Sequence, residues 1–117
     1  MAGIYIHIPF CAKRCAYCGF FSTSRLSHRE RYTAAVCSEL QAEREWLGNG
    51  KVNTLYLGGG TPSQLHPSQL ERIMDAVRNY PGTGSMSELT IECNPDDITP
   101  GFVRNISDMG FNRISMG

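Results

Sequence analysis

Three cysteines near the N-terminus have the spacing of metal ligands. Cys11, Cys15 and Cys18 form the pattern C-x3-C-x2-C. Three thiolates in this pattern can bind three irons of a cubane iron–sulfur cluster and leave the fourth iron open to another ligand. A structural zinc site usually has four protein ligands, whereas Cys37 and Cys93 lie far along the chain. The spacing therefore favours a cluster with an open iron; a zinc knuckle or free loop thiols are the alternatives.

A run of three glycines follows the apolar segment 52–57. Gly58, Gly59 and Gly60 have no side chains, so their backbone can approach a ligand closely and expose its N–H and C=O groups. Thr61 adds a hydroxyl group directly after them. The run is not a phosphate-binding loop, because no Gly-Lys-Ser/Thr sequence follows it. The pattern is compatible with a ligand contact or with a simple tight turn.

A single carboxylate interrupts the third apolar segment. Glu92 lies between Ile91 and Cys93, so its side chain should point to the opposite face of a strand from both. Burying a carboxylate without a partner is costly. Contact with a ligand is therefore favoured, and an internal ion pair with Arg113 is the alternative. Cys93 is expected in the core, and Asn94 shares the face of Glu92.

Apolar periodicity predicts the elements that position these residues. Strands are expected over residues 3–8, 52–57, 88–93 and 112–116, with helices over about 28–47, from Pro67 onward and after Thr99. This alternation implies parallel strands joined by right-handed crossovers, as in a barrel or a doubly wound sheet. The cysteines, the glycines and Asn94 all follow strand ends, where sites form in parallel α/β folds.

Local signals set the expected helix ends and buried faces. Ser27 and Glu30 are predicted to form a capping box for the first helix, and His28 and His66 to lie at caps or in first turns. The first helix should bury Tyr32, Val36, Leu40 and Leu47; the second Leu70, Ile73, Met74 and Val77; the third Phe102, Val103 and Ile106.

Composition narrows the class of protein. The 117 residues include 11 basic and 11 acidic side chains, so charge gives no indication of nucleic acid or an anionic membrane. No apolar run approaches the roughly 20 residues that span a bilayer. Five cysteines without an export signal favour the reducing cytoplasm. A complete barrel needs about 250 residues, so residues 1–117 are expected to be the N-terminal part of a longer protein.

Four sequence blocks in this order resemble the radical S-adenosylmethionine (SAM) superfamily. Within it they are similar to oxygen-independent coproporphyrinogen III oxidases and the related HemW-type heme chaperones. The blocks are residues 3–18, 55–63, 91–95 and 110–117. The resemblance implies a TIM-like (β/α) barrel of which this chain is the N-terminal portion. It also implies a 4Fe–4S cluster on Cys11, Cys15 and Cys18 that binds SAM and cleaves it to a 5′-deoxyadenosyl radical.

The resemblance further implies which residues contact SAM. Tyr17 would lean against the adenine, and Tyr5 and Glu92 occupy positions of SAM-contacting residues. The run from Gly58 to Gly60 would meet the methionyl amino group, with Thr61 adding a contact. A core role for Tyr5 and loop packing for Tyr17 are the alternatives. His7 is interpreted as a core histidine rather than a ligand.

The residues after the third cysteine bear on which member of the family this is. Phe20 occupies the place where the oxidases carry a further cysteine, and Phe20 and Ser22 match HemW-type proteins, although Gly19 replaces their aspartate. The resemblance therefore favours a chaperone that binds heme and passes it to an acceptor protein. The alternative is an oxidase that decarboxylates two propionates of coproporphyrinogen III. Either needs an electron donor. A third hypothesis is an electron-transfer or structural metal protein that binds no SAM.

Overall fold

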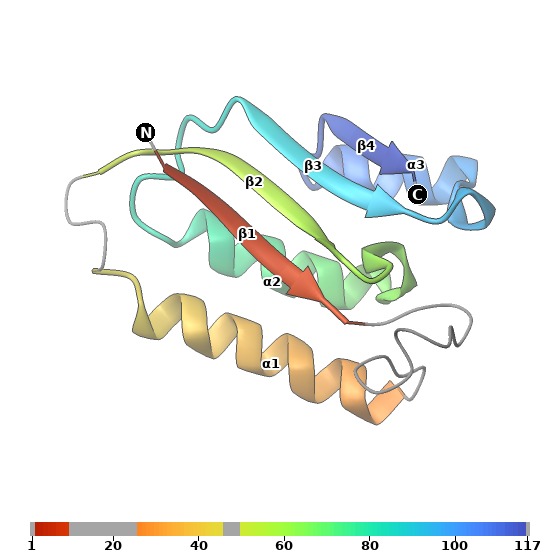
Figure 1. Ribbon diagram of the computed structural model, residues 1–117, viewed down its shortest axis with the longest axis horizontal. Coiled ribbons are helices and arrows are strands. Elements are labelled where there is room, and N and C mark those ends of the chain that lie inside the picture. The colour runs from red at the N-terminus through yellow and green to blue at the C-terminus, as the bar shows by residue number, and fades with distance from the viewer. Residues whose placement is uncertain (1, 10–25, 46–49, 117) are drawn as a thin grey trace.

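The chain forms a parallel sheet with helices on one side. The computed structural model describes residues 2–9, 26–45 and 50–116 (Figure 1). The four strands pair in the order β1-β2-β3-β4, all parallel. They are β1 (Ala2–Ile8), β2 (Val52–Gly59), β3 (Glu88–Cys93) and β4 (Arg113–Met116). The connections contain the helices α1 (Leu26–Ala42), α2 (Pro67–Arg78) and α3 (Pro100–Asp108) and the short 3-10 helices η1 (Pro62–Gln64) and η2 (Pro95–Asp97). The predicted alternation of strands and helices is confirmed.

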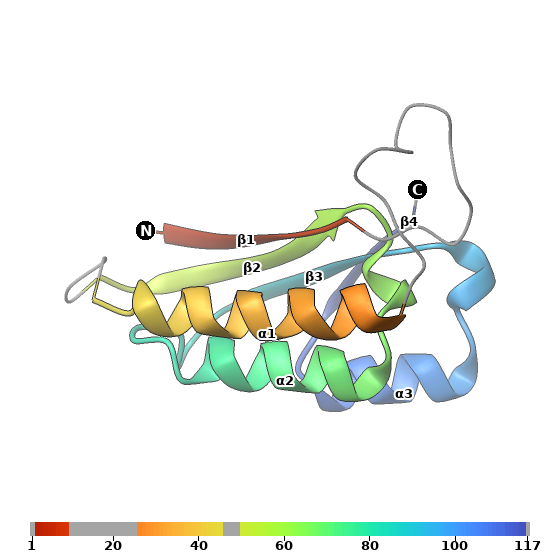
Figure 2. The same ribbon diagram turned by 90° about the horizontal axis from the view of Figure 1, so that it is seen from below.

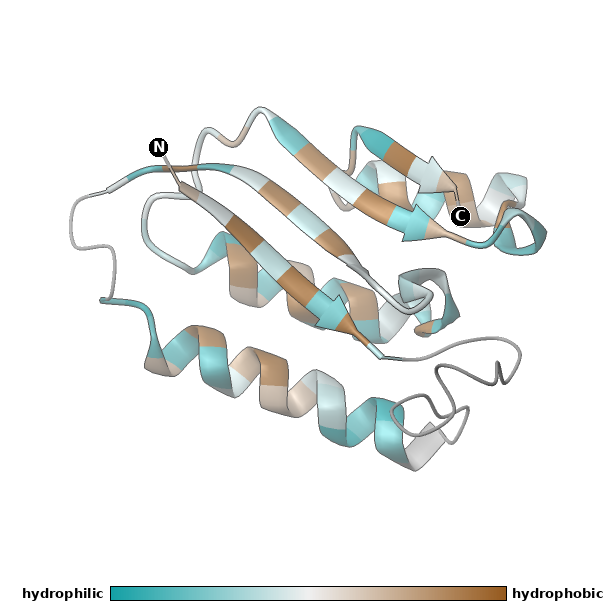
Figure 3. Ribbon diagram, in the orientation of Figure 1, coloured by the Kyte–Doolittle hydropathy of each residue, from teal (hydrophilic) through white to brown (hydrophobic). Residues whose placement is uncertain are grey.

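The core lies between the sheet and the helices. Alternate residues of each strand point towards the helices, which gives the banding of apolar positions in Figure 3. The predicted stripe of α2 is buried, with Leu70, Ile73, Met74 and Val77 all at 0% exposure. They pack in one cluster with Leu55, Leu57 and Ile91 from the sheet. Burial of this stripe, rather than helix propensity alone, stabilises α2 against the sheet.

The opposite face of the sheet carries the polar and aromatic residues. Helices α1, α2 and α3 all lie on one side of the sheet (Figure 2). Tyr5 is 58% exposed on the other side, and His7 is also exposed. The interpretation of His7 as a core histidine therefore does not hold within residues 1–117. Its backbone carbonyl accepts a hydrogen bond from the Tyr32 hydroxyl of α1, at the edge of β1 that pairs with no described strand.

The first helix begins earlier than predicted. Ser27 lies inside α1, which starts at Leu26, so the capping box of Ser27 and Glu30 is wrong. The Glu30 carboxylate instead forms an ion pair with Arg72 of α2 at 2.6 Å and accepts a hydrogen bond from Gln69. A contact between two helices therefore replaces the local cap. The helix also ends at Ala42, before the predicted end at residue 47, and Leu47 lies outside the described residues.

The other two helices follow their predicted signals more closely. His66 caps α2 and forms a capping box with Gln69, and Thr99 caps α3. In α3, Ile106 is buried but Val103 is 40% exposed, so its predicted burial is wrong. The apolar stripe of this helix runs instead through Phe102, Ile106 and Met109 at helical spacing. Within the described ranges, no helix is long and apolar enough to cross a membrane.

Candidate functional site

The glycine turn, Gly58 to Gly60, lies at the carboxyl end of β2, beside the carboxyl end of β1. The Gly60 N–H donates a hydrogen bond to the Ile8 carbonyl at 2.7 Å. Gly59 has φ +102°, which L residues with a side chain rarely adopt, and a Cβ atom there would overlap the His7 ring. The turn therefore requires glycine at position 59 for both its backbone conformation and the space beside β1.

The structure brings Glu92 against this turn. The Tyr56 hydroxyl donates to Glu92 Oε2 at 2.6 Å, and the Gly59 N–H donates to Glu92 Oε1 at 2.9 Å. A Cβ atom on Gly58 would lie 2.7 Å from Glu92 Oε1, so the carboxylate occupies space that only glycine leaves open. The glycine run and the carboxylate, predicted separately as ligand contacts, thus form one site.

The carboxylate of Glu92 is held by hydrogen bonds rather than by an ion pair. None of the ion pairs of the described residues includes it, and Arg113 pairs with Glu88 instead. The alternative of an ion pair between Glu92 and Arg113 is therefore wrong. The hydrogen bond to Glu92 raises the pKa of Tyr56 above its ordinary value, because ionisation of the phenol would remove the donor.

Two tyrosines form an aromatic surface beside Glu92. Tyr5 and Tyr56 are paired in register across β1 and β2, and their rings stack with centroids 5.7 Å apart at 15°. Tyr5 is 58% exposed on this face within residues 1–117. Its open face provides a flat, apolar surface near the carboxylate, suitable for a ligand with both an apolar part and a cationic group.

A set of hydrogen bonds, absent from the sequence predictions, joins the loops after β2 and β3. Ser63 Oγ and Gln64 Nε2 both donate to Asp97 Oδ2, at 2.7 and 2.8 Å. The Asn94 N–H donates to Ser63 Oγ at 3.2 Å, and its side chain caps η2 by accepting from the Asp96 N–H. We call this set the η1–η2 brace. It fixes the loop that follows the glycines relative to the loop that follows Glu92.

The cysteine triplet lies outside the described residues. Cys11, Cys15, Cys18 and Tyr17 belong to the segment after β1, and β1 ends at the same edge of the sheet as β2 with its glycine turn. Among the residues that the structure does describe, no three His, Cys, Asp or Glu side chains are grouped as metal ligands. Thr61 takes the N-cap position of η1, but its side chain makes no capping hydrogen bond.

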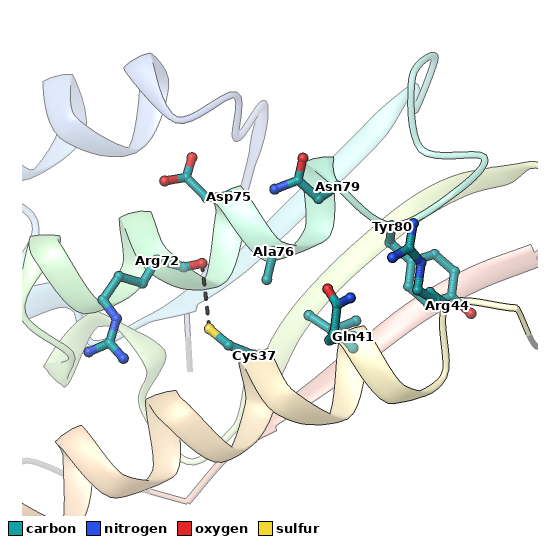
Figure 4. A pocket seen from close by; sticks show the side chains of 9 residues that line it. Cys37, Gln41, Arg44, Arg72, Asp75, Ala76, Asn79 and Tyr80 are labelled. Carbon is teal, nitrogen blue, oxygen red and sulfur yellow. Dashed lines mark hydrogen bonds between the residues drawn. The ribbon is translucent and has the colours of Figure 1, made fainter.

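The two described cysteines have environments that suppress thiolate chemistry. Cys93 is buried, and burial raises its pKa to about 11. Cys37 lies in a cleft of about 330 Å³ between α1 and α2, where its Sγ is 3.6 Å from the Arg72 carbonyl oxygen (Figure 4). Burial raises the pKa of this thiol too. Packing roles, predicted for both, agree with these environments.

The geometry fits an amino acid ammonium group at Glu92. Each carboxylate oxygen has capacity for a further donor beyond the one that it accepts here. Gly58 is buried against Glu92, whereas Gly59 and Gly60 are not fully buried and leave part of their backbone accessible. A carboxylate, a glycine turn and a stacked aromatic pair on one face of the sheet are suited to a ligand like SAM, which carries an ammonium, a sulfonium and an adenine.

Comparisons with known proteins agree with this description of the fold. The model of the radical SAM superfamily matches residues 5–117. Heme chaperone HemW of Mycobacterium tuberculosis (strain H37Rv) is 35% identical over 98% of this chain, and that of Bacillus subtilis is 34% identical over 100%. The oxygen-independent coproporphyrinogen III oxidase of Salmonella typhimurium is 34% identical over 97% of this chain.

A solved structure of a radical SAM enzyme has the same fold over this chain. Coproporphyrinogen III oxidase (HemN) from Escherichia coli, described as a radical SAM enzyme, matches with a TM-score of 0.88 and 32% identity, over 99% of this chain and 27% of that one. The chain spans about 30% of the length of the HemW relatives and 25% of the Salmonella oxidase. Its four parallel strands form part of a radical SAM barrel. The chain belongs to the radical SAM superfamily, whose members generally bind a 4Fe–4S cluster and SAM.

Proposed function

We propose that this chain is the N-terminal part of a HemW-type heme chaperone that binds a 4Fe–4S cluster, SAM and heme. The similarity to HemW proteins over nearly the whole chain supports the proposal. So does Phe20, which stands where the oxidases carry a further cysteine. A reducing, cytoplasmic location belongs to the proposal, because the three cysteines must stay as thiolates to bind iron.

The observation that carries SAM binding is the position of Glu92. Its carboxylate is fixed against the glycine turn by two hydrogen bonds, at the sheet edge from which the cysteine loop leaves β1. In this proposal Glu92 accepts a hydrogen bond from the methionyl ammonium. The backbone carbonyls of Gly58 to Gly60 accept from its remaining N–H groups. An ammonium placed there lies at the sheet edge where β1 ends, and the three cysteines follow β1 in the sequence.

The other predicted residues complete the site in this proposal. Cys11, Cys15 and Cys18 would hold three irons of the cluster, and its fourth iron would be open to SAM. When bound, the cluster supplies the electron that breaks a carbon–sulfur bond of SAM. Tyr5 and Tyr17 shield the ligand from water by packing against its apolar parts, and Thr61 offers a hydroxyl.

The second candidate is an oxygen-independent coproporphyrinogen III oxidase. It is favoured by the Salmonella relative at 34% identity and by the TM-score of 0.88 to the Escherichia coli oxidase. Such an enzyme would convert two propionates of coproporphyrinogen III to vinyl groups. The cysteine that the oxidases carry at position 20 is phenylalanine here, which argues for the chaperone.

One experiment separates the candidates. The full-length protein, reconstituted anaerobically with iron and sulfide, is incubated with SAM, a strong reductant and coproporphyrinogen III. The chaperone proposal expects no protoporphyrin fluorescence after oxidation and a stoichiometric spectral change on hemin titration. Protoporphyrin formation would instead assign the oxidase activity. Unchanged SAM affinity in Glu92→Ala would refute the assigned role of Glu92 and favour a metal protein that binds no SAM.

A further inference from the structure

We propose that Tyr56 is the positioning residue for the Glu92 carboxylate, and that it sets the affinity of the site for the amino acid end of SAM. The inference rests on the proposed function, because it takes Glu92 as the acceptor of the methionyl ammonium. Tyr56 lies on β2 and Glu92 on β3, so the contact joins two strands across the open face of the sheet. Neither the superfamily resemblance nor the predicted ligand set assigns Tyr56 a role.

The hydrogen bonds of Glu92 leave it few alternatives in orientation. Tyr56 Oη donates to Oε2 at 2.6 Å, a short bond of the kind formed with an ionised acceptor. The Gly59 N–H donates to Oε1 at 2.9 Å. A carboxylate with a fixed donor on each oxygen cannot rotate freely about its last bond. Its remaining lone pairs therefore keep one direction, which a ligand ammonium can use without first ordering the side chain.

Tyr56 is itself held in place. Its ring stacks on that of Tyr5 with centroids 5.7 Å apart. The hydrogen bond to Glu92 is also the largest cause of the raised pKa of Tyr56, so its hydroxyl stays protonated and remains a donor. A side-chain hydrogen bond with Ser115 lowers this pKa by a smaller amount. The phenol is thus a rigid donor aimed at a carboxylate, whereas Gly59 contributes only through the backbone.

The test is a double-mutant cycle on the full-length, cluster-loaded protein, with equilibrium binding as the readout. Tyr56→Phe removes the hydroxyl and keeps the ring stack with Tyr5. We expect it to weaken SAM binding by about threefold to tenfold, because the Glu92 side chain must then be ordered when the ligand binds. In a Glu92→Ala background the same change should alter SAM affinity less than about twofold, because the group that Tyr56 positions is gone.

Two controls distinguish positioning from a general structural role. The sulfonium 5′-dimethylsulfonio-5′-deoxyadenosine carries adenosine but no amino acid, so Tyr56→Phe should leave its affinity unchanged. Tyr80→Phe removes a hydroxyl that donates to the Glu43 carbonyl at 2.9 Å, away from the site, and should leave SAM binding unchanged. Equal weakening of SAM and of the sulfonium would overturn the inference, as would wild-type SAM affinity in Tyr56→Phe.

The failure of the inference can be told apart from the failure of the proposed function. If Glu92→Ala weakens SAM binding and Tyr56→Phe does not, only the inference fails. If Glu92→Ala has no effect, the proposed ammonium contact fails and the inference with it. A crystal structure of the wild-type complex with SAM is the measurement that needs no variant. It supports the inference if Glu92 contacts both Tyr56 Oη and the methionyl nitrogen, and overturns it if Glu92 turns away from Tyr56.

Discussion

Replacing Gly59 by alanine tests the glycine turn, in which the Gly59 N–H donates to Glu92. The new Cβ meets two separate costs. At φ +102° an L residue is strained by about 1–2 kcal/mol. The Cβ also overlaps the His7 ring, and such overpacking typically costs about 1–3 kcal/mol. Because the His7 ring is exposed and can turn aside, the lower part of that range applies. We expect a total loss of about 2–4 kcal/mol in the free energy of unfolding.

Two other glycines separate these costs. Gly110 has φ +105° at the end of α3, but a Cβ there would lie 3.8 Å from its nearest neighbour, an ordinary contact. Gly110→Ala should therefore show the backbone cost alone, about 1–2 kcal/mol. Gly101 lies in the first turn of α3 with nothing within 4 Å of a new Cβ. Gly101→Ala should be neutral or stabilise the protein by up to about 1 kcal/mol.

The assay is urea unfolding of the full-length protein followed by far-ultraviolet circular dichroism, with all variants under identical conditions. Adding His7→Ala to Gly59→Ala should recover the steric part and bring the loss close to that of Gly110→Ala. A Gly59→Ala variant as stable as Gly110→Ala would refute the argument from the His7 ring. Wild-type stability in both Gly59→Ala and Gly110→Ala would refute the argument from backbone conformation.

Three further predictions concern the brace, a buried thiol and the core. Asp97→Ala removes the acceptor of two side-chain donors and should lower stability by about 1–2 kcal/mol in the same assay, whereas the exposed neighbour Asp96→Ala should change it by less than about 0.5 kcal/mol. Cys93, with a pKa of about 11, should react with iodoacetamide at pH 8 about a hundredfold more slowly than an unhindered thiol, as measured by peptide mass spectrometry. Its raised pKa adds stability below about pH 9 that is lost as the pH rises towards 11. The fall in the free energy of unfolding over this pH range should therefore be smaller in Cys93→Ala. Leu55→Ala should cost about 2–5 kcal/mol of unfolding free energy, and the exposed Val103→Ala far less; similar losses would contradict the core assignment.

Local patterns predicted the elements well because their causes are local. Strand β3 occupies the predicted residues 88–93, and α2 begins at Pro67 behind its cap. The alternation around Glu92 placed its side chain on the face opposite the core, as the structure has it. Prolines, caps and apolar spacing act within a few residues, so one sequence contains the whole signal.

The sequence did not predict the contacts that join distant residues. Tyr56 and Glu92 are 36 positions apart, and Ser63 and Asp97 are 34 apart, so no spacing rule connects them. The error at the start of α1 has the same origin, since Glu30 pairs with Arg72 across 42 positions instead of capping its own helix. Val103 was misplaced because two overlapping stripes on α3 have similar apolar content, and only packing against the sheet selects one.

The strand order of the sheet has a consequence for synthesis on the ribosome. Each described strand pairs with the one made just before it, so β2 needs only β1, β3 needs only β2, and β4 needs only β3. The sheet can therefore grow in the direction of translation, with the newest strand always providing the edge for the next. On the oldest edge, that of β1, the Tyr32 hydroxyl of α1 donates to one backbone carbonyl, that of His7. Growth in the order of synthesis leaves no completed strand waiting for a partner made later, which lowers the chance that unfinished chains pair with one another.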